Sequence, residues 1–188
     1  MPRFVLLDRD GVINCRIISD YVSCWEKFAF LPGALEALRL LNEKNYRVIV
    51  VSNQAGVGKG LMTHVDLAEI TRRFVVEVEA QGGRILGVYY CTHRAEDGCE
   101  CRKPKPGLLR RAQAEHHFDF GHTFVVGDTE TDLLAAHAAG CPAIMVSEGS
   151  VAGLEKLPHA PRLTVPTLLA AVEFLVNEPE CYNRLAQC

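Results

Sequence analysis

The fold is decided by the stretch Phe4-Val5-Leu6-Leu7-Asp8-Arg9-Asp10-Gly11-Val12. Four apolar residues followed by two acids and a glycine are typical of a buried parallel strand with carboxylates at its carboxyl end. In open α/β sheets, ligands bind at that end. Because one residue separates Asp8 from Asp10, the pair can supply a nucleophile and an acid/base. Taken alone, the pattern also fits solvated acids at a strand end, so other segments must decide.

Apolar runs of the same kind recur along the chain, and helical patterns separate them. The runs are continuous rather than alternating, which predicts strands that are buried on both faces. The expected strands are 4–7, 47–51, 86–90, 123–126 and 143–146. The expected helices are 33–43, 64–81, 106–116, 130–139 and 167–177. This alternation predicts an α/β fold with a doubly wound, mainly parallel sheet and helices on both faces.

The composition is typical of one globular domain, which we assign to residues 1–188. The net charge of −3 argues against a nucleic-acid partner. No apolar run approaches the ~20 residues of a membrane span, and the first acid, Asp8, comes too early for a secretory signal. We therefore expect a cytoplasmic monomer that binds neither nucleic acid nor a membrane. The segment 14–30 is expected to be a loop or small hairpin, and 177–188 has no readable pattern.

Polar residues follow several of the expected strands. They are Asp8 and Asp10, Ser52-Asn53-Gln54, and Gly127-Asp128 with Asp132 one helical turn later, while Lys103 lies between the third and fourth strands. A parallel sheet gathers its carboxyl ends on one side. Each residue has an ordinary structural explanation when taken alone, but their concurrence at strand ends favours a site.

The residue types at these strand ends indicate phosphate chemistry. Carboxylates at close range repel one another unless a divalent cation lies among them, and hard oxygen ligands beside a phosphate favour Mg²⁺. A lysine, a hydroxyl and backbone N–H groups suit the outer oxygens of a phosphate. Phosphoryl transfer relies mainly on such positioning and charge neutralisation. The expected partner is therefore a small phosphorylated metabolite.

A second cluster of metal-binding residue types lies in the loop 91–101. The sequence Cys91-Thr92-His93, five further residues, and then Cys99-Glu100-Cys101 supplies three thiols and one imidazole. Four such ligands form the closed tetrahedral set of a structural zinc site. We predict that Cys91, His93, Cys99 and Cys101 bind Zn²⁺. Because Arg102 and Lys103 follow the last ligand directly, the metal would fix where these cations point.

The strand-end motifs resemble those of the haloacid dehalogenase superfamily of aspartate-nucleophile phosphatases. The resemblance implies that Asp8 attacks phosphorus to form an aspartyl-phosphate, and that Asp10 protonates the leaving oxygen and then activates water. It implies that Mg²⁺ is held by Asp8, the backbone carbonyl of Asp10, and Asp128. Asp132 either supports this site or simply begins a helix.

The resemblance also implies which residues contact the substrate. Ser52 and Lys103 would hold the transferring phosphoryl group. The full set of expected substrate contacts is Arg9, Ser52, Asn53, Gln54, Arg102 and Lys103. Phosphatases of this type lack a large cap domain, so specificity would rest on the loops 14–30, 54–61 and 92–102.

Within the superfamily, the thiol loop is similar to that of the small zinc-bearing phosphatases that act on heptose 1,7-bisphosphate and on histidinol phosphate. Asp20-Tyr21-Val22 and the stretch from Asn53 to Gly60 favour the heptose enzymes. Two departures from those enzymes are Thr129, where lysine is common, and Lys59, where arginine is common. A sugar-bisphosphate phosphatase is the leading hypothesis. Histidinol-phosphate phosphatase, polynucleotide 3′-phosphatase and a non-catalytic binding module remain alternatives.

Overall fold

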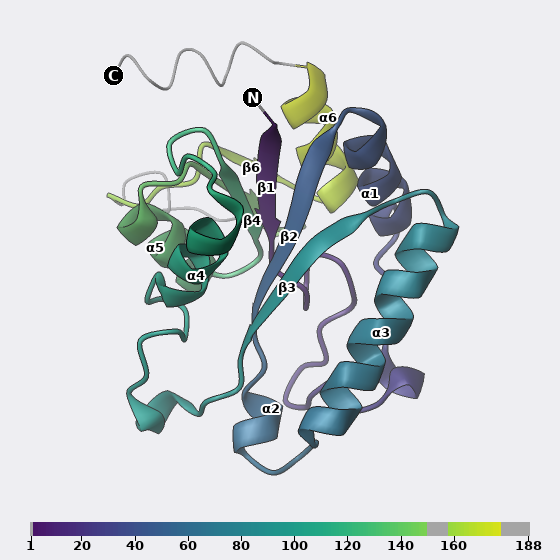
Figure 1. Ribbon diagram of the computed structural model, residues 1–188, viewed down its shortest axis with the longest axis vertical. Helices are drawn as coiled ribbons and strands as arrows, with labels where there is room; N and C mark the ends of the chain where they lie inside the picture. Colours follow the sequence, from purple (N-terminus) through teal and green to yellow (C-terminus); the bar gives the residue numbers. More distant parts are fainter. Residues whose placement is uncertain (1, 150–157, 178–188) are drawn as a thin grey trace.

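The computed structural model of the chain describes residues 2–149 and 158–177. Its centre is a six-stranded, fully parallel sheet with the order β3-β2-β1-β4-β5-β6 (Figure 1). The strands are β1 (Arg3–Leu7), β2 (Tyr46–Asn53), β3 (Ile85–Cys91), β4 (Phe124–Gly127), β5 (Ala143–Val146) and β6 (Leu163–Val165). The doubly wound parallel sheet predicted from the sequence is confirmed.

Helices cover both faces of the sheet (Figure 1). One face carries α1 (Ala34–Glu43), α3 (His64–Ala80) and α6 (Leu168–Asn177), and the other carries α4 (Gly107–His116) and α5 (Glu130–Ala139). A short helix, α2 (Ala55–Gly58), and two 3₁₀ turns, Trp25–Lys27 and Ala95–Asp97, lie in the connecting loops. Among the described residues, no cap domain is inserted between these elements.

The central strands divide their side chains between two apolar cores. Val5 and Leu7 of β1 point into the core under α1, α3 and α6, whereas Phe4 and Leu6 point into the core under α4 and α5. Because successive side chains of a strand point to opposite faces, a sheet covered on both faces needs an apolar residue at every position. This requirement explains the continuous apolar runs in the sequence.

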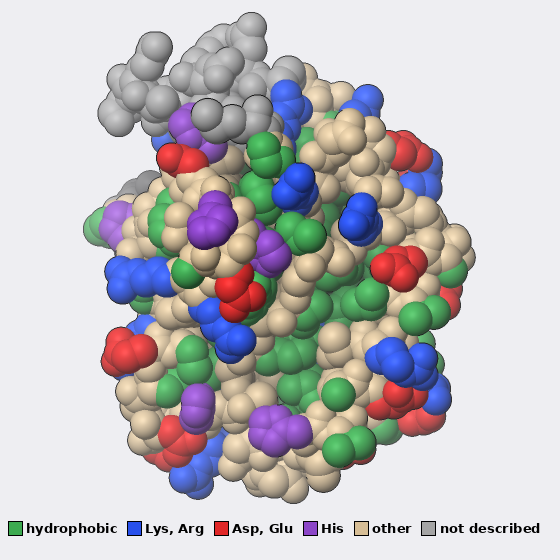
Figure 2. Space-filling model, in the orientation of Figure 1, with side chains coloured by type: hydrophobic (Ala, Val, Ile, Leu, Met, Phe, Trp, Pro, Cys, Tyr) green, Lys and Arg blue, Asp and Glu red, His purple; other side chains and the backbone are tan. Residues whose placement is uncertain are grey.

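The structure differs from the sequence-based expectation at the edges of the sheet. β6 was not predicted, and it has only three residues, all of them half-buried. β3 was expected to be buried on both faces, but it is the other edge strand and most of its side chains are half-exposed. Figure 2, which has the orientation of Figure 1, shows hydrophobic side chains across the middle of the view, where Figure 1 shows β3.

The remaining connections take simple forms. The segment 14–30 is a loop with one 3₁₀ turn, and Asn14 forms single bridges with Asp10 and Phe30. Residues 178–188 of the C-terminal segment lie outside the described residues. None of the helices in the described ranges is long and apolar enough to span a bilayer.

Candidate active site

The acids of the site come from the two central strands, where the winding of the sheet reverses direction. Asp8 follows β1, Asp128 follows β4, and these strands are paired. The Asp8 backbone N–H donates to the Val126 carbonyl at 2.9 Å, which extends the pairing to the first acid. Single ligand atoms from Asp8, Asp128 and Asp132 all lie within 4.8 Å of one another. This is the place where ligands bind in doubly wound sheets.

Two glycines allow these carboxylates to approach one another. Gly11 has a φ of +90°, and a Cβ atom there would lie 1.9 Å from Oδ2 of Asp128. A Cβ atom on Gly127 would lie 2.2 Å from Cβ of Asp132. Any larger residue at either position would push an acid out of the cluster, so glycine is required for the packing of the site.

The Lys103 ammonium group lies inside the acidic cluster. Its Nζ atom is 3.0 Å from Oδ1 of Asp8, and it donates to Oδ1 of Asp132 at 2.5 Å and to the Val51 carbonyl at 2.9 Å. The Asn53 side chain holds the Lys103 backbone, with its Nδ2 donating to the carbonyl at 3.0 Å and its Oδ1 accepting from the N–H at 3.1 Å. The strand end thus sets the position of the loop that carries the lysine.

Asp132 contacts both Lys103 and the start of α5. One oxygen accepts from Lys103, and the other accepts from the Thr129 backbone N–H at 3.1 Å and hydroxyl at 2.6 Å. The second pair of contacts caps the start of α5. Asp132 therefore begins the helix and also holds the lysine in place, and each of its oxygens already has a protein donor.

Burial and mutual repulsion dominate the electrostatics of the cluster. Burial raises the pKa of Asp8, and Asp132 raises it further, while Lys103 acts in the opposite direction. Burial also raises the pKa of Asp128 to about 7. Burial alone would lower the pKa of Lys103, but Asp8 and Asp132 outweigh it and raise that pKa. Carboxylates this close hold their charge best with additional positive charge, so the cluster favours a bound cation.

Asp10 is held in one orientation by three neighbouring side chains. Nη2 of Arg9 lies 3.0 Å from each carboxylate oxygen of Asp10. Nε2 of Gln54 donates to Oδ2 at 2.6 Å, and Nδ2 of Asn14 donates to Oδ1 at 2.8 Å. Because these donors fill one side of the carboxylate, Asp10 cannot turn freely, although its side chain remains 21% exposed.

Two of the expected substrate contacts lie outside the pocket lining. Arg9 and Gln54 are fully buried, and neither lines the pocket beside the carboxylates. Side chains alternate along an extended segment, so Arg9 points away from Asp8 and lies over the ring of Tyr90. From there its guanidinium reaches Asp10 and the Gln54 side chain. Both residues thus contact Asp10 from outside the pocket lining.

The other expected substrate contacts line a pocket of about 580 Å³. They are Ser52, Asn53, Arg102 and Lys103, and the pocket also contains Asp8 and Asp10. A hydrogen bond with the Ser52 hydroxyl acts to lower the pKa of Asp8. Nη1 of Arg102 is buried and has no hydrogen-bond partner among the described residues. A buried donor of this kind is costly to leave unpaired, so it favours an anionic ligand.

Part of the pocket wall was not predicted residue by residue. Residues 16–22 and Lys59 line it, as expected for the loops 14–30 and 54–61, and Nζ of Lys59 lies 5.5 Å from the ring centre of Tyr21. Thr131 also lines the pocket, and Asn14, which is not a lining residue, donates to Asp10 through its Nδ2. Their only sequence signal is closeness to the acidic motifs, which does not single out a residue.

The four residues of the thiol loop meet at one point. Sγ of Cys101 lies 3.2 Å from Sγ of Cys91, 3.5 Å from Sγ of Cys99 and 3.3 Å from Nδ1 of His93. Ligands of a tetrahedral zinc ion with Zn–S bonds of about 2.3 Å lie roughly 3.8 Å apart. The separations are thus close to those of a zinc site, and the residue types fit it.

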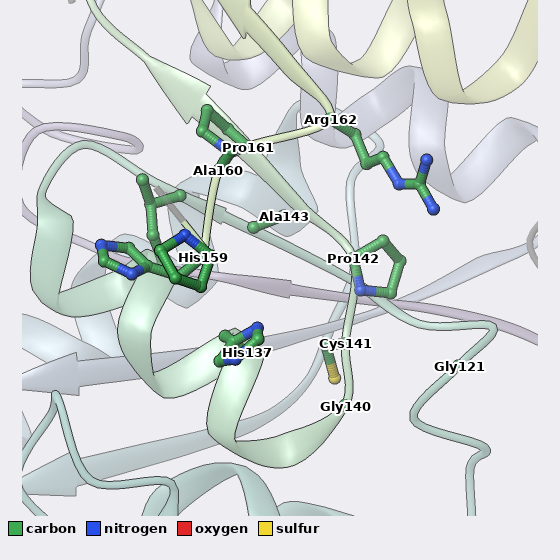
Figure 3. A pocket seen from close by; sticks show the side chains of 12 residues that line it. Gly121, His137, Gly140, Cys141, Pro142, Ala143, His159, Ala160, Pro161 and Arg162 are labelled. Atoms are coloured by element: carbon green, nitrogen blue, oxygen red, sulfur yellow. The ribbon is translucent and has the colours of Figure 1, made fainter. Parts of the chain in front are cut away.

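A second hollow lies at the opposite edge of the sheet, beside the C-terminal end of α5 (Figure 3). It is lined by residues that include His137, His159 and Arg162, and the Arg162 side chain points away from the two histidines. None of the acids or cations predicted for the site lines it. The chemistry is therefore concentrated at the carboxyl edge.

Known proteins with similar sequences match most of the chain. A family model described as HAD-hydrolase-like matches residues 100–171. D-glycero-alpha-D-manno-heptose-1,7-bisphosphate 7-phosphatase of Mycobacterium tuberculosis is 38% identical over 156 residues, which cover 80% of this chain and 82% of that protein. D-glycero-beta-D-manno-heptose-1,7-bisphosphate 7-phosphatase of Pseudomonas aeruginosa is 37% identical over 145 residues, which cover 77% of this chain and 81% of that protein.

A solved structure matches almost the whole fold. It is D,D-heptose 1,7-bisphosphate phosphatase from B. bronchiseptica, complexed with magnesium and phosphate. The TM-score is 0.87 and the sequence identity is 32%, and the match covers 94% of this chain and 99% of that chain. The similarity therefore extends well beyond the segment that the family model matches.

Proposed function

Because the chain belongs to the HAD-like hydrolases, we propose that it is a magnesium-dependent phosphatase that converts a heptose 1,7-bisphosphate to the 1-phosphate. One structural observation carries the proposal. Asp8, Lys103 and Asp128 come from three separate segments, yet Asp8 lies within reach of both Lys103 and Asp128, and Asp8 and Lys103 line one pocket. The chemistry of phosphate transfer needs this combination of a nucleophile, a fixed cation and a further acid.

Asp8 is proposed as the nucleophile. Its Oδ1 accepts from the Arg9 backbone N–H at 2.8 Å and lies 3.0 Å from Nζ of Lys103. Both contacts are made by Oδ1, so Oδ2 takes part in neither. Attack on phosphorus forms an aspartyl-phosphate and releases the sugar hydroxyl. Lys103 and the Ser52 hydroxyl are placed to stabilise the charge on the transferring group.

Asp10 is proposed as the general acid and base. It would give a proton to the leaving oxygen and later take one from the water that hydrolyses the aspartyl-phosphate. The contacts from Arg9, Gln54 and Asn14 hold its carboxylate two residues away from the nucleophile. Arg9 and Gln54 are therefore positioning residues, because they act on the reaction through Asp10.

The proposed magnesium ligands are Asp8, the backbone carbonyl of Asp10, and Asp128. A cationic nitrogen of Arg16 fits among these groups: it donates to Asp128 and to the Asp10 carbonyl, and lies 3.9 Å from Oδ2 of Asp8. Three hard oxygens that converge on one positive group are a suitable donor set for Mg²⁺. Bound there, the ion would neutralise charge on the phosphoryl oxygens and on the nucleophile.

The thiol loop is proposed to hold a structural zinc ion through Cys91, His93, Cys99 and Cys101. All four ligand positions would be protein groups, so no position is open for catalysis. Cys101 is followed directly by Arg102 and Lys103, and both of these line the pocket. Its proposed function is to fix the cationic side of the substrate site.

The substrate proposal rests on the whole-chain relatives. Proteins named for the alpha anomer and for the beta anomer match at 38% and 37% identity. The identity values thus support a heptose 1,7-bisphosphate without separating the anomers. Lys59 and Arg102 line the same pocket as the nucleophile and give it the positive charge that a second phosphate group requires.

The direct test is phosphate release from a panel of substrates with and without Mg²⁺. The panel contains both anomers of heptose 1,7-bisphosphate, histidinol phosphate and 3′-phosphorylated DNA. We expect turnover of at least one heptose anomer to exceed that of the other two classes by at least tenfold, and to require Mg²⁺. Preferential turnover of histidinol phosphate or of 3′-phosphorylated DNA would overturn the proposal that the substrate is a heptose bisphosphate. Removal of the phosphate group at C1, instead of the one at C7, would overturn the proposed orientation of the sugar in the pocket.

A further inference from the structure

Arg16 occupies a special place in the carboxylate cluster. Its Nη2 atom donates to Oδ1 of Asp128 at 2.6 Å and to the Asp10 carbonyl at 3.1 Å, and it lies 3.9 Å from Oδ2 of Asp8. We propose that Arg16 is a built-in counterion that competes with the divalent cation for these oxygens and moves aside when the cation binds. The inference rests on the proposed function only in that the same three groups bind the metal.

The ion pairs of the cluster show why a second cation is needed. Asp8 and Asp132 share the buried Lys103 ammonium group. Asp128 forms its ion pair with Arg16, at 2.6 Å. Without Arg16 or a metal ion, three partly or fully buried carboxylates would have one close positive partner. Arg16 therefore stabilises the protein when no divalent ion is bound.

A guanidinium in this position and a divalent ion exclude each other. Mg²⁺ binds oxygens at about 2.1 Å and needs the same lone pairs that Arg16 uses. Arginine also keeps its positive charge at every pH at which a protein is folded. Steric overlap and charge repulsion therefore both oppose simultaneous occupancy. Metal binding has to break the contacts of Arg16 with Asp128 and with the Asp10 carbonyl.

The backbone and side chain of Arg16 suit such a movement. The preceding segment is anchored, because the Cys15 N–H donates to the Ala29 carbonyl at 2.8 Å and Asn14 bridges to Phe30. The Arg16 side chain, in contrast, is 43% exposed, while that of Lys103 is 2% exposed. The pocket beside it provides about 580 Å³ of space. The lysine is thus the permanent cation of the site, and the arginine is the displaceable one.

The test is direct binding of Mn²⁺, as a paramagnetic substitute for Mg²⁺, to the zinc-containing protein without substrate. Free Mn²⁺ is measured by electron paramagnetic resonance for the wild type, Arg16→Ala and Arg16→Gln. We expect both variants to bind Mn²⁺ about two- to fivefold more tightly, the range that corresponds to one exposed ion pair. Arg72→Ala is the matched control, since Arg72 forms an exposed ion pair with Glu69 on α3; its Mn²⁺ affinity should not change.

Thermal unfolding gives a second measurement that needs no catalysis. In zinc-containing protein without Mg²⁺ or Mn²⁺, Arg16→Ala should unfold at a lower temperature than the wild type, and added Mg²⁺ should raise the unfolding temperature of the variant by more than that of the wild type. Mn²⁺ affinity of both variants equal to or weaker than wild type would overturn the role of Arg16. Asp128→Asn separates that result from failure of the metal site itself. If Asp128→Asn leaves Mn²⁺ binding intact, both the metal site and the inference are wrong.

Discussion

The two metal-binding clusters of this protein are built in opposite ways. The thiol cluster lies within eleven residues of one loop, from Cys91 to Cys101, whereas the carboxylate cluster joins Asp8 to Asp128 and Asp132 across most of the chain. The first uses soft ligands and local geometry. The second uses hard ligands, and it exists only because the parallel sheet brings β1 and β4 together. A substitution in the thiol loop should therefore disturb that loop alone, whereas the carboxylate cluster depends on the correct folding of the whole sheet.

The largest expected effect comes from Asp8→Asn in the carboxylate cluster. Asparagine keeps the shape and can still accept the Arg9 N–H, but it cannot form the aspartyl-phosphate. We expect turnover of the preferred substrate to fall on the order of 10³-fold or more. Because burial and repulsion raise the pKa of Asp8, removing its charge should not lower the unfolding temperature of the protein without Mg²⁺. Turnover and thermal unfolding are measured on the same samples.

The control for Asp8→Asn is Asp119→Asn. Asp119 is an exposed acid that pairs with His122 outside the pocket. Its loss should leave turnover unchanged, and both variants should keep the zinc content of the wild type. Asp8→Asn with turnover near the wild-type rate would show that another group attacks phosphorus.

The sequence predicted the acids more readily than their supports, for a physical reason. Acids at the ends of apolar strands have a fixed place in a parallel sheet, so the strand pattern alone brings Asp8 and Asp128 together. The positions of Arg16 and Asn14 depend on the path of an irregular loop, which has no periodicity. The resemblance implied that Arg9 contacts the substrate, and the alternation of side chains along the chain buries Arg9 on the opposite side from Asp8.

The same contrast explains which strands could be predicted. The four central strands are buried on both faces, so each carries a continuous apolar run. β6 has three half-buried residues at an edge, Leu163–Val165, and such a short segment has no distinctive pattern. The zinc ligands of the thiol loop could be predicted without knowledge of the fold, because their spacing within one short segment is itself typical of a metal site.

A smaller effect is expected from Cys99→Ala in the thiol cluster. Removing one of four ligands should reduce bound zinc, measured by elemental analysis, to well below one equivalent. Arg102 and Lys103 would then lose the fixed end of their loop, so turnover should fall about 10- to 100-fold. The sheet should persist, with little change in far-ultraviolet circular dichroism. Loss of zinc and of turnover with an intact sheet would show that the substitution disturbs only the thiol loop.

Cys15→Ala is the matched control for that loss. Cys15 is a half-buried thiol outside the cluster, so its removal should leave zinc content unchanged. Two results would contradict the assignment of the loop. One is a full equivalent of zinc in Cys99→Ala, and the other is loss of zinc without any change in substrate use.

The smallest expected effect is a dependence of stability on pH, and it belongs to the carboxylate cluster. Burial, together with Asp8 and Asp132, raises the pKa of Asp128 to about 7, against the opposing effects of Arg16 and Lys103. Between pH 4 and 7, the folded protein therefore holds a proton that the unfolded chain has lost. The contribution of Asp128 to the free energy of unfolding must then fall as pH rises through this window and level off above pH 7.

Asp128→Asn isolates the contribution of this one acid to the pH dependence. In zinc-containing protein without Mg²⁺, wild type should lose roughly 2 kcal/mol of stability relative to Asp128→Asn between pH 5 and 8. Urea unfolding at each pH measures this difference. Saturating Mg²⁺ should reduce the loss, because a bound cation replaces the proton as the partner of the carboxylate. The opposite result, without Mg²⁺, would be a wild type that gains stability relative to Asp128→Asn as pH rises. It would mean that cations of the protein already neutralise the charge of Asp128. The two clusters would then differ only in how the chain brings their residues together.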